Sequence, residues 1–233
     1  METLFLDPFT ILLIAGFIGF FMAFGIGAND VANSMGTSVG SRAITIKQAI
    51  IIAAIFEFLG AFLAGGEVTS TIRKGIVDPE LYADQTNIFV IGMLSALLAG
   101  GTWLYLASLR GWPVSTTHTI VGSIVGFVLI TKGVDAVSWS KVGNIAMSWV
   151  TSPLFSATLA FGLYISAKKL ILERSNPGEA AIRYIPFYSF LVAVVISLVT
   201  ARKGLKHVGV EFTDNEVYLF IAIFSSIVGL ATA

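Results

Sequence analysis

Two carboxylates in apolar surroundings are the first residues of this sequence that could do chemistry. Asp30 follows 22 residues without a formal charge, and Glu57 interrupts a second apolar run. A carboxylate at the centre of a bilayer costs about 2.5 to 3.5 kcal/mol on insertion scales, so each needs a partner or a proton. No Lys or Arg lies inside an apolar run. A bound cation, a proton, a polar ligand or purely structural hydrogen bonds remain as partners.

The segment around Asp30 reads Gly-Ile-Gly-Ala-Asn-Asp-Val-Ala-Asn over residues 25–33. Gly25 and Gly27 weaken a helix just before Asn29 and Asp30. A polar interruption of a membrane helix is tolerated only where protein or a water-filled cavity covers the freed backbone groups. The sequence therefore predicts a break in the first helix and a binding site beside it.

A second polar group, Ser115-Thr116-Thr117, follows Pro113 and suits the first turn of a helix. Free backbone N–H groups, the positive end of the helix dipole and three hydroxyls would converge there, which can hold an oxyanion without a basic side chain. Such runs also cap helices without binding a ligand. The adjacent His118 could donate to an anion, carry a proton or serve as a structural hydrogen-bond donor.

The elements that must position these residues are membrane helices. The chain is 56% hydrophobic and 12% charged, with a mean hydropathy of +0.88, which is more apolar surface than a soluble core of 233 residues can bury. Fourteen basic and fourteen acidic residues balance, so no charge excess points to nucleic acid. The absence of cysteine excludes disulfide and thiol chemistry. We expect an all-α integral membrane protein in contact with the lipid bilayer.

Charge spacing divides the chain into seven apolar segments. They cover residues 8–29, 48–66, 85–109, 111–131, 142–167, 184–201 and 217–233. The third is rich in small residues that allow another helix to approach closely. The apolar part of the fourth, residues 120–130, is too short to span a bilayer and predicts a half-helix that enters the membrane and stops. Pro153 should kink or break the fifth segment.

Four motifs resemble the amino-terminal half of the inorganic phosphate transporter (PiT) family. They are residues 27–34 (Gly-Ala-Asn-Asp-Val-Ala-Asn-Ser), 57–60 (Glu-Phe-Leu-Gly), 111–118 (Gly-Trp-Pro-Val-Ser-Thr-Thr-His) and 148–153 (Ser-Trp-Val-Thr-Ser-Pro). The resemblance covers most of the chain, and the first and third motifs together are highly specific. It implies a secondary transporter, not an enzyme, that carries inorganic phosphate with sodium or protons and uses no further cofactor.

The same motif matching assigns roles to individual residues. Asp30, Ser115, Thr116 and Thr117 look like phosphate ligands. The residues that look like coupling-ion or supporting groups are Asn29, Asn33, Glu57 and His118. A sodium ion would be held by Asn29, Asp30 and Asn33.

The resemblance to this family also implies a protein built from two inverted repeats. Each repeat would have its own Asn-Asp motif and Ser-Thr-Thr run, and the substrate would lie between the repeats. This chain carries one copy of each motif, and its last apolar segment has 17 residues without a flanking charge. We expect residues 1–233 to form a single transmembrane domain of broken or re-entrant helices, one half of the inverted-repeat architecture, cut near its carboxyl end. A second repeat or another copy of the chain would complete it, in the plasma membrane of a prokaryote.

Other functions also fit some of these residues. One is a proton-coupled sulfate or metal-phosphate permease on the same scaffold, although a carboxylate such as Asp30 can accept a proton from phosphate and finds none on sulfate. An intramembrane enzyme would use Asp30 and His118 as acid and base, but the sequence lacks a metal-ligand cluster and a nucleophile with its base. A third alternative is a non-transporting half-length subunit or receptor.

Overall fold

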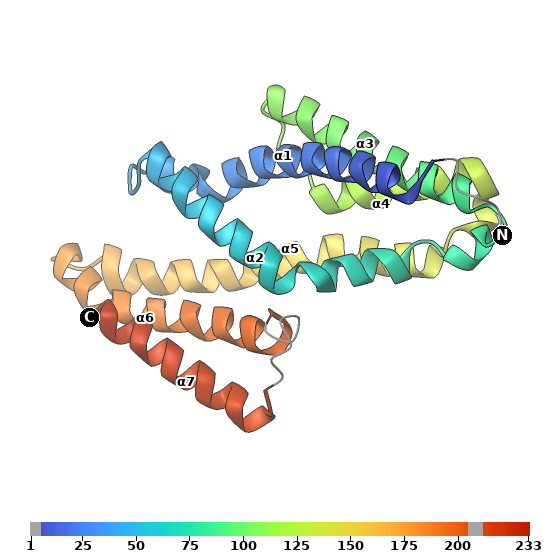
Figure 1. Cartoon of the computed structure of the whole chain (residues 1–233). Helices are drawn as coiled ribbons and strands as arrows, with labels where there is room; N and C mark the ends of the chain where they lie inside the picture. The colour runs from blue at the N-terminus through green and yellow to red at the C-terminus, as the bar shows by residue number, and fades with distance from the viewer. Residues whose placement is uncertain (1–5, 205–211) are drawn as a thin grey trace. The chain divides into compact units, whose positions relative to one another are not determined.

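The computed structural model describes residues 6–204 and 212–233, without the side chains of residues 64, 66–75, 203 and 204, and these ranges form helices and no strands (Figure 1). The long helices are α1 (Pro8–Gly40), α2 (Ile46–Gly75), α3 (Thr86–Leu109), α4 (Thr116–Lys132), α5 (Trp139–Ala167), α6 (Pro177–Val199) and α7 (Asp214–Ala231). Short helical turns are η1 (Pro79–Tyr82), η2 (Val134–Ala136), η3 (Lys168–Leu172) and η4 (Thr200–Gly204).

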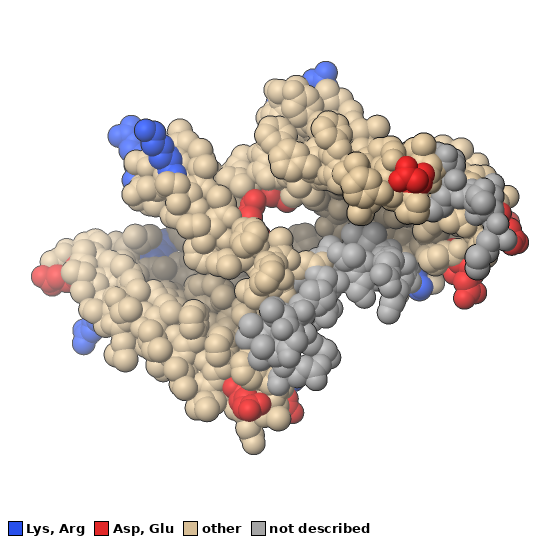
Figure 2. Space-filling view, in the orientation of Figure 1, with Lys and Arg blue, Asp and Glu red and all other residues tan. Residues whose placement is uncertain are grey.

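Six helical stretches are long and apolar enough to cross a bilayer, and the 17-residue α4 is shorter. Each of the seven expected segments corresponds to one of α1–α7, so the all-α membrane fold is confirmed. Figure 2 shows the charged side chains mostly near helix ends, with a broad surface of other residues between them. This distribution is what a bilayer requires of a protein embedded in it.

The chain divides into two compact units. The first unit comprises Met1–Glu57 and Thr69–Gly143, and the second comprises Phe58–Val68 and Asn144–Ala233. In the first unit α3 packs against both α1 and α4, and in the second α6 packs against α7 and η3. The buried serines Ser197 and Ser225 face each other across α6 and α7 with hydroxyl oxygens 3.5 Å apart.

Glycines allow the close approach of α1, α3 and α4. A Cβ atom on Gly101 of α3 would lie 3.1 Å from the Cα of Met22, and a Cβ on Gly25 of α1 would lie 3.1 Å from the Cβ of Leu104. The ring of Phe127 in α4 fills the space beside Gly92, where a Cβ would come within 1.9 Å of it. The expectation that small residues of the third segment admit neighbouring helices is therefore confirmed at these positions.

Tyr82 holds the open end of the α3–α4 hairpin through its hydroxyl and its ring. The hydroxyl of Tyr82 in η1 lies 2.6 Å from that of Thr131, and the ammonium group of Lys132 lies 4.8 Å from the centre of the Tyr82 ring. The carboxyl end of α4 thus lies beside the turn that precedes α3. The shortness of α4 agrees with the expected half-helix, but α4 runs back along α3 as the second arm of a hairpin.

Three local expectations differ from the structure, wholly or in part. α1 continues as one helix through residues 25–33, because Gly25 packs against α3 and Ser34 donates its hydroxyl to the carbonyl of Asp30, leaving the backbone helical. α5 continues through Pro153 from Trp139 to Ala167, so a break there is wrong, and the expected alternative, a kink, stays a prediction. α6 begins at Pro177, seven residues before the expected segment, because the side chain of Asn176 caps it by accepting from the Glu179 amide.

We expect Gly92→Ala to destabilise the first unit by about 1–3 kcal/mol, because the added methyl overlaps the Phe127 ring. Thermal unfolding of the purified chain in detergent, followed by circular dichroism, measures the effect. Gly126→Ala in α4 is the matched control, since nothing lies within 4 Å of its added methyl. The double variant Gly92→Ala/Phe127→Leu should recover part of the loss. Equal melting of both alanine variants would contradict this packing.

Candidate functional site

The connection between α3 and α4 begins with a glycine that ends α3. Gly111 has a φ of +66°, its amide donates to the carbonyl of Ser108, and the Trp112 amide donates to the carbonyl of Ala107. This pair of hydrogen bonds is the Schellman termination, which favours glycine because its left-handed position disfavours a Cβ atom. The chain thus leaves α3 at Gly111, and the carbonyl of Trp112 is not used by the hydrogen bonds that terminate the helix.

That carbonyl is bound by α1. The side-chain amide of Asn29, a buried residue with 5% exposure, donates to the carbonyl oxygen of Trp112 at 3.0 Å. The side-chain amide of Asn33, one turn further along α1, donates to the side-chain oxygen of Asn29 at 3.2 Å. Asn29 therefore fixes the α3–α4 connection against α1. This contact lies eleven residues before the end of α1 at Gly40, or about 16 Å along the helix.

The expected helix start at the Ser-Thr-Thr run is confirmed. Ser115 is the N-cap of α4, and its hydroxyl oxygen accepts from the amide of His118 at 3.3 Å. The helix begins at Thr116. The amides of Thr116 and Thr117 are the first two of the helix, and amides at these positions have no partner within a helix. They are available to an anion, together with the positive end of the helix dipole.

The structure brings Thr116 and Asp30 together. The hydroxyl oxygen of Thr116 lies 3.2 Å and 3.4 Å from the two carboxylate oxygens of Asp30 and can donate to either. Asp30 is half-buried on α1, one residue beyond Asn29. Among the side chains that the structure describes, ion pairs join Lys168 to Glu173 and Arg202 to Asp214, so none involves Asp30. Its hydrogen-bonding partner is a hydroxyl at a helix start.

Glu57 of α2 approaches the same helix. One of its carboxylate oxygens lies 3.8 Å from the position that a Cβ atom on Gly27 would occupy. Gly27 and Asp30 are three residues apart in α1 and share a face of the helix. Two carboxylates therefore lie along one face of α1, an arrangement that attracts a cation. In the described parts of the chain no three His, Cys, Asp or Glu side chains are grouped as a metal site.

The remaining predicted residues lie on another side of the start of α4. Ser115 and His118 line an open hollow of about 400 Å³ together with Trp103, Pro113, Val114 and Thr119. Thr117 is exposed. The predicted set is thus divided between the Asp30–Thr116 contact and this hollow, and the roles of all these residues in binding stay predictions.

Sequence reasoning missed the residues that position the site. Trp112 supplies the carbonyl that Asn29 binds, and its ring lies 5.0 Å from the guanidinium of Arg110 and 6.3 Å from the ring of Trp103. The usable signal was Arg110 and Gly111 after the charge-free segment and before Pro113, a pattern typical of a helix end. Nothing in the local pattern pointed to a contact with Asn29, 83 residues earlier.

Comparisons with known proteins agree in pointing to one family. The profile of the phosphate transporter family matches residues 26–229. A Haemophilus influenzae protein named as a candidate phosphate permease is 51% identical over 93% of this chain and 51% of its own length. The chloroplastic inorganic phosphate transporter 2-1 of Arabidopsis thaliana is 50% identical over 77% of this chain and 30% of its own length.

A solved structure gives the same result. A protein named as the sodium-dependent phosphate transporter is 41% identical and superposes with a TM-score of 0.87, over 96% of this chain and 54% of that one. The chain thus spans about half the length of relatives that it matches. With a family match over most of its residues and six membrane-length helical stretches in the part that the structure describes, this integral membrane protein belongs to the phosphate transporter family.

Proposed function

We propose that this chain supplies one half of a transporter that moves inorganic phosphate across a membrane by cation-coupled symport. The observation that carries the proposal is the contact between Asp30 and Thr116, which places a carboxylate at the start of a membrane helix with free amides. The names of the relatives, which refer to phosphate, support the choice of substrate. Prokaryotic relatives support a plasma membrane location.

Phosphate is bound at the start of α4. The amides of Thr116 and Thr117 and the hydroxyls of Ser115, Thr116 and Thr117 donate to its oxygens, and the helix dipole offsets part of its charge. Asp30 faces the anion and accepts a hydrogen bond from the protonated oxygen that monobasic or dibasic phosphate carries at neutral pH. Sulfate has no such proton, so Asp30 favours phosphate over sulfate.

A cation is needed because phosphate and Asp30 repel each other. Sodium bound beside Asp30, with amide oxygens of Asn33 and Asn29 as further ligands, lowers this repulsion, and Glu57 adds attraction for the ion along α1. Binding of each ion then strengthens binding of the other, and this reciprocity couples their transport. The name of the solved relative, which refers to sodium, favours that ion. A proton on Asp30 is the alternative, and His118 could assist its transfer.

A second half completes the transporter. The chain covers about half of its relatives, and none of the residues of α5 is buried. We infer that residues 1–233 act as one transmembrane domain, which pairs with a second repeat or another copy of the chain and encloses phosphate between the two. Alternating access then arises from rocking of one half against the other.

We expect the chain alone to take up little phosphate, because half of the ligands are missing. Proteoliposomes that also contain the unmatched half of the Haemophilus influenzae relative should accumulate radiolabelled phosphate when sodium is supplied outside. Excess sulfate should compete weakly. Equal uptake with and without the added half would contradict the need for it, and strong sulfate competition would favour the sulfate permease.

In the same two-part assembly, Asp30→Asn should abolish the difference in phosphate affinity between sodium and choline buffers, because the neutral amide no longer attracts the cation. Thr116→Val should weaken phosphate binding about tenfold, since it removes a donor to a charged group. Equilibrium binding of radiolabelled phosphate measures both effects.

The matched control is Thr102→Val, which removes an exposed α3 hydroxyl that donates to the carbonyl of Leu98 in its own helix. Its affinity and sodium dependence should stay within about twofold of those of the unmodified protein. Retained sodium dependence in Asp30→Asn, with wild-type phosphate affinity in Thr116→Val, would reject the site.

We expect the two asparagines to differ. Asn33→Ala should raise the sodium concentration needed for half-maximal phosphate binding and leave tryptophan fluorescence unchanged. Asn29→Ala releases the carbonyl of Trp112, so it should also shift the tryptophan emission and weaken phosphate binding at saturating sodium. Identical effects of the two variants in fluorescence and binding would show that Asn29 does not position the α3–α4 connection.

A further inference from the structure

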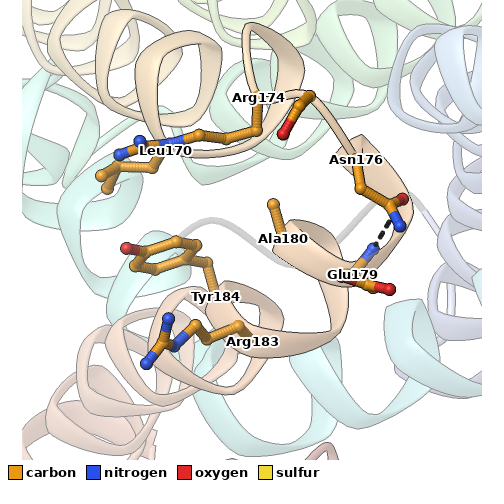
Figure 3. Close-up of a pocket in the computed structure, with 8 residues that line it drawn as sticks. Leu170, Arg174, Asn176, Glu179, Ala180, Arg183 and Tyr184 are labelled. Carbon is orange, nitrogen blue, oxygen red and sulfur yellow. Dashed lines mark hydrogen bonds between the residues drawn. The ribbon is translucent and has the colours of Figure 1, made fainter.

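The second unit contains a basic pocket that is separate from the residues of the proposed phosphate site. A hollow of about 490 Å³ lies between η3, the connection that follows it and the first two turns of α6 (Figure 3). The residues that matter to its chemistry are Leu170, Arg174, Glu179, Ala180, Arg183 and Tyr184. All belong to the second unit, whereas Asp30 and Thr116 belong to the first.

The pocket carries two positive charges without a facing carboxylate. Figure 3 shows the guanidinium groups of Arg174 and Arg183 and the hydroxyl of Tyr184 on one side of the pocket, with the carboxylate of Glu179 directed away from them. Among the described side chains, the ion pairs of this protein use Lys168 with Glu173 and Arg202 with Asp214. Neither guanidinium of the pocket is therefore neutralised by an acid from the described part of the chain.

These groups are suited to the oxygens of a phosphate group. A guanidinium presents several N–H donors in a planar fork that binds two phosphate oxygens at once, and the Tyr184 hydroxyl adds another donor. The amino end of α6 adds no argument for phosphate binding, because the Glu179 amide there already donates to the side chain of Asn176. The two arginines facing one hollow carry the argument.

The position of the pocket indicates where that phosphate group comes from. One membrane-length helical stretch ends at Leu172 and the next begins at Pro177, so the pocket lies where the chain leaves and re-enters the apolar layer. Leu170, Ala180 and the ring of Tyr184 line it, and exposed Leu172 and Ile182 flank it. A lipid carries a phosphate beside an acyl chain that could contact these apolar side chains, whereas free phosphate carries only the charge. Basic pockets at the membrane surface suit anionic headgroups.

We propose that the pocket between η3 and α6 binds the phosphate of an anionic phospholipid headgroup through Arg174, Arg183 and Tyr184. The bound lipid anchors the α5–α6 connection at the membrane surface, and its negative charge offsets the positive charges of the two arginines. The residues 168–184 hold four basic and two acidic side chains, an excess of two positive charges that agrees with an anionic occupant.

Native mass spectrometry of the full chain, titrated with phosphatidylglycerol or with phosphatidylcholine, tests the proposal without requiring transport. The unmodified chain should retain phosphatidylglycerol preferentially, and Arg174→Gln/Arg183→Gln should weaken that binding about tenfold or more. The single variants give the matched control: Arg174→Gln should weaken the binding about fivefold, whereas Lys169→Gln, which removes one positive charge from η3 but no residue that lines the pocket, should change the affinity less than about threefold. Tyr184→Phe should give an intermediate loss.

Two results would overturn the proposal. An equal loss of phosphatidylglycerol in the arginine and lysine variants would show diffuse attraction to basic surface. Displacement of the lipid by millimolar inorganic phosphate, together with arginine-dependent binding of phosphate alone, would assign the pocket to free phosphate.

Because Arg174 and Arg183 are exposed, the variants should keep the helical circular dichroism and the melting temperature of the unmodified chain. The variant Arg174→Lys/Arg183→Lys keeps the charge but not the planar guanidinium fork, so it should recover part of the lipid binding.

Discussion

A carboxylate within an apolar helix must find a partner, and this requirement explains the geometry of the first unit. Asp30 meets a hydroxyl at the start of α4. A lysine or arginine in this place would have formed a fixed ion pair and left no room for a second anion or a cation. A hydroxyl and a helix start stabilise negative charge more weakly, because a helix end carries only about half an elementary charge. Ions can therefore exchange at such a site.

The contact depends on close packing of three helices. Glycines at 25 and 101 let α1 and α3 touch nearly at their backbones, and the ring of Phe127 fills the space beside Gly92. The hairpin of α3 and α4 then turns at Gly111, and Asn29 binds the carbonyl that this turn exposes. Packing of apolar helices thus determines where a polar contact forms, since lipid provides no alternative partner for these groups.

Much of this arrangement could be predicted from the sequence, for identifiable reasons. Apolar length and charge spacing predicted seven helices because a bilayer imposes them, and Ser115 was identifiable as a cap from its residue type and position. The predicted break at Gly25 was wrong because the same residue favours both a loosened helix and a tight helix crossing, and only the neighbouring helix decides between them. A break at Pro153 is wrong as well, since a membrane helix can continue past a proline when surrounding groups accommodate it. The contact between Asn29 and Trp112 joins residues far apart in the sequence, which no local pattern encodes.

The two asparagines of α1 differ in their hydrogen bonds, and this difference bears on the proposed cation site. Asn29 is buried and uses its amide nitrogen for the Trp112 carbonyl and its oxygen for Asn33, so both polar atoms of its side chain already have a partner. Asn33 is exposed and uses its nitrogen toward Asn29, which leaves its oxygen for another partner. A cation beside Asp30 would therefore draw first on Asn33, and any competition for the oxygen of Asn29 would loosen the α3–α4 connection. In the proposed site, cation binding would be linked to the position of the α4 helix start through this single amide, which is the kind of linkage that coupled transport requires.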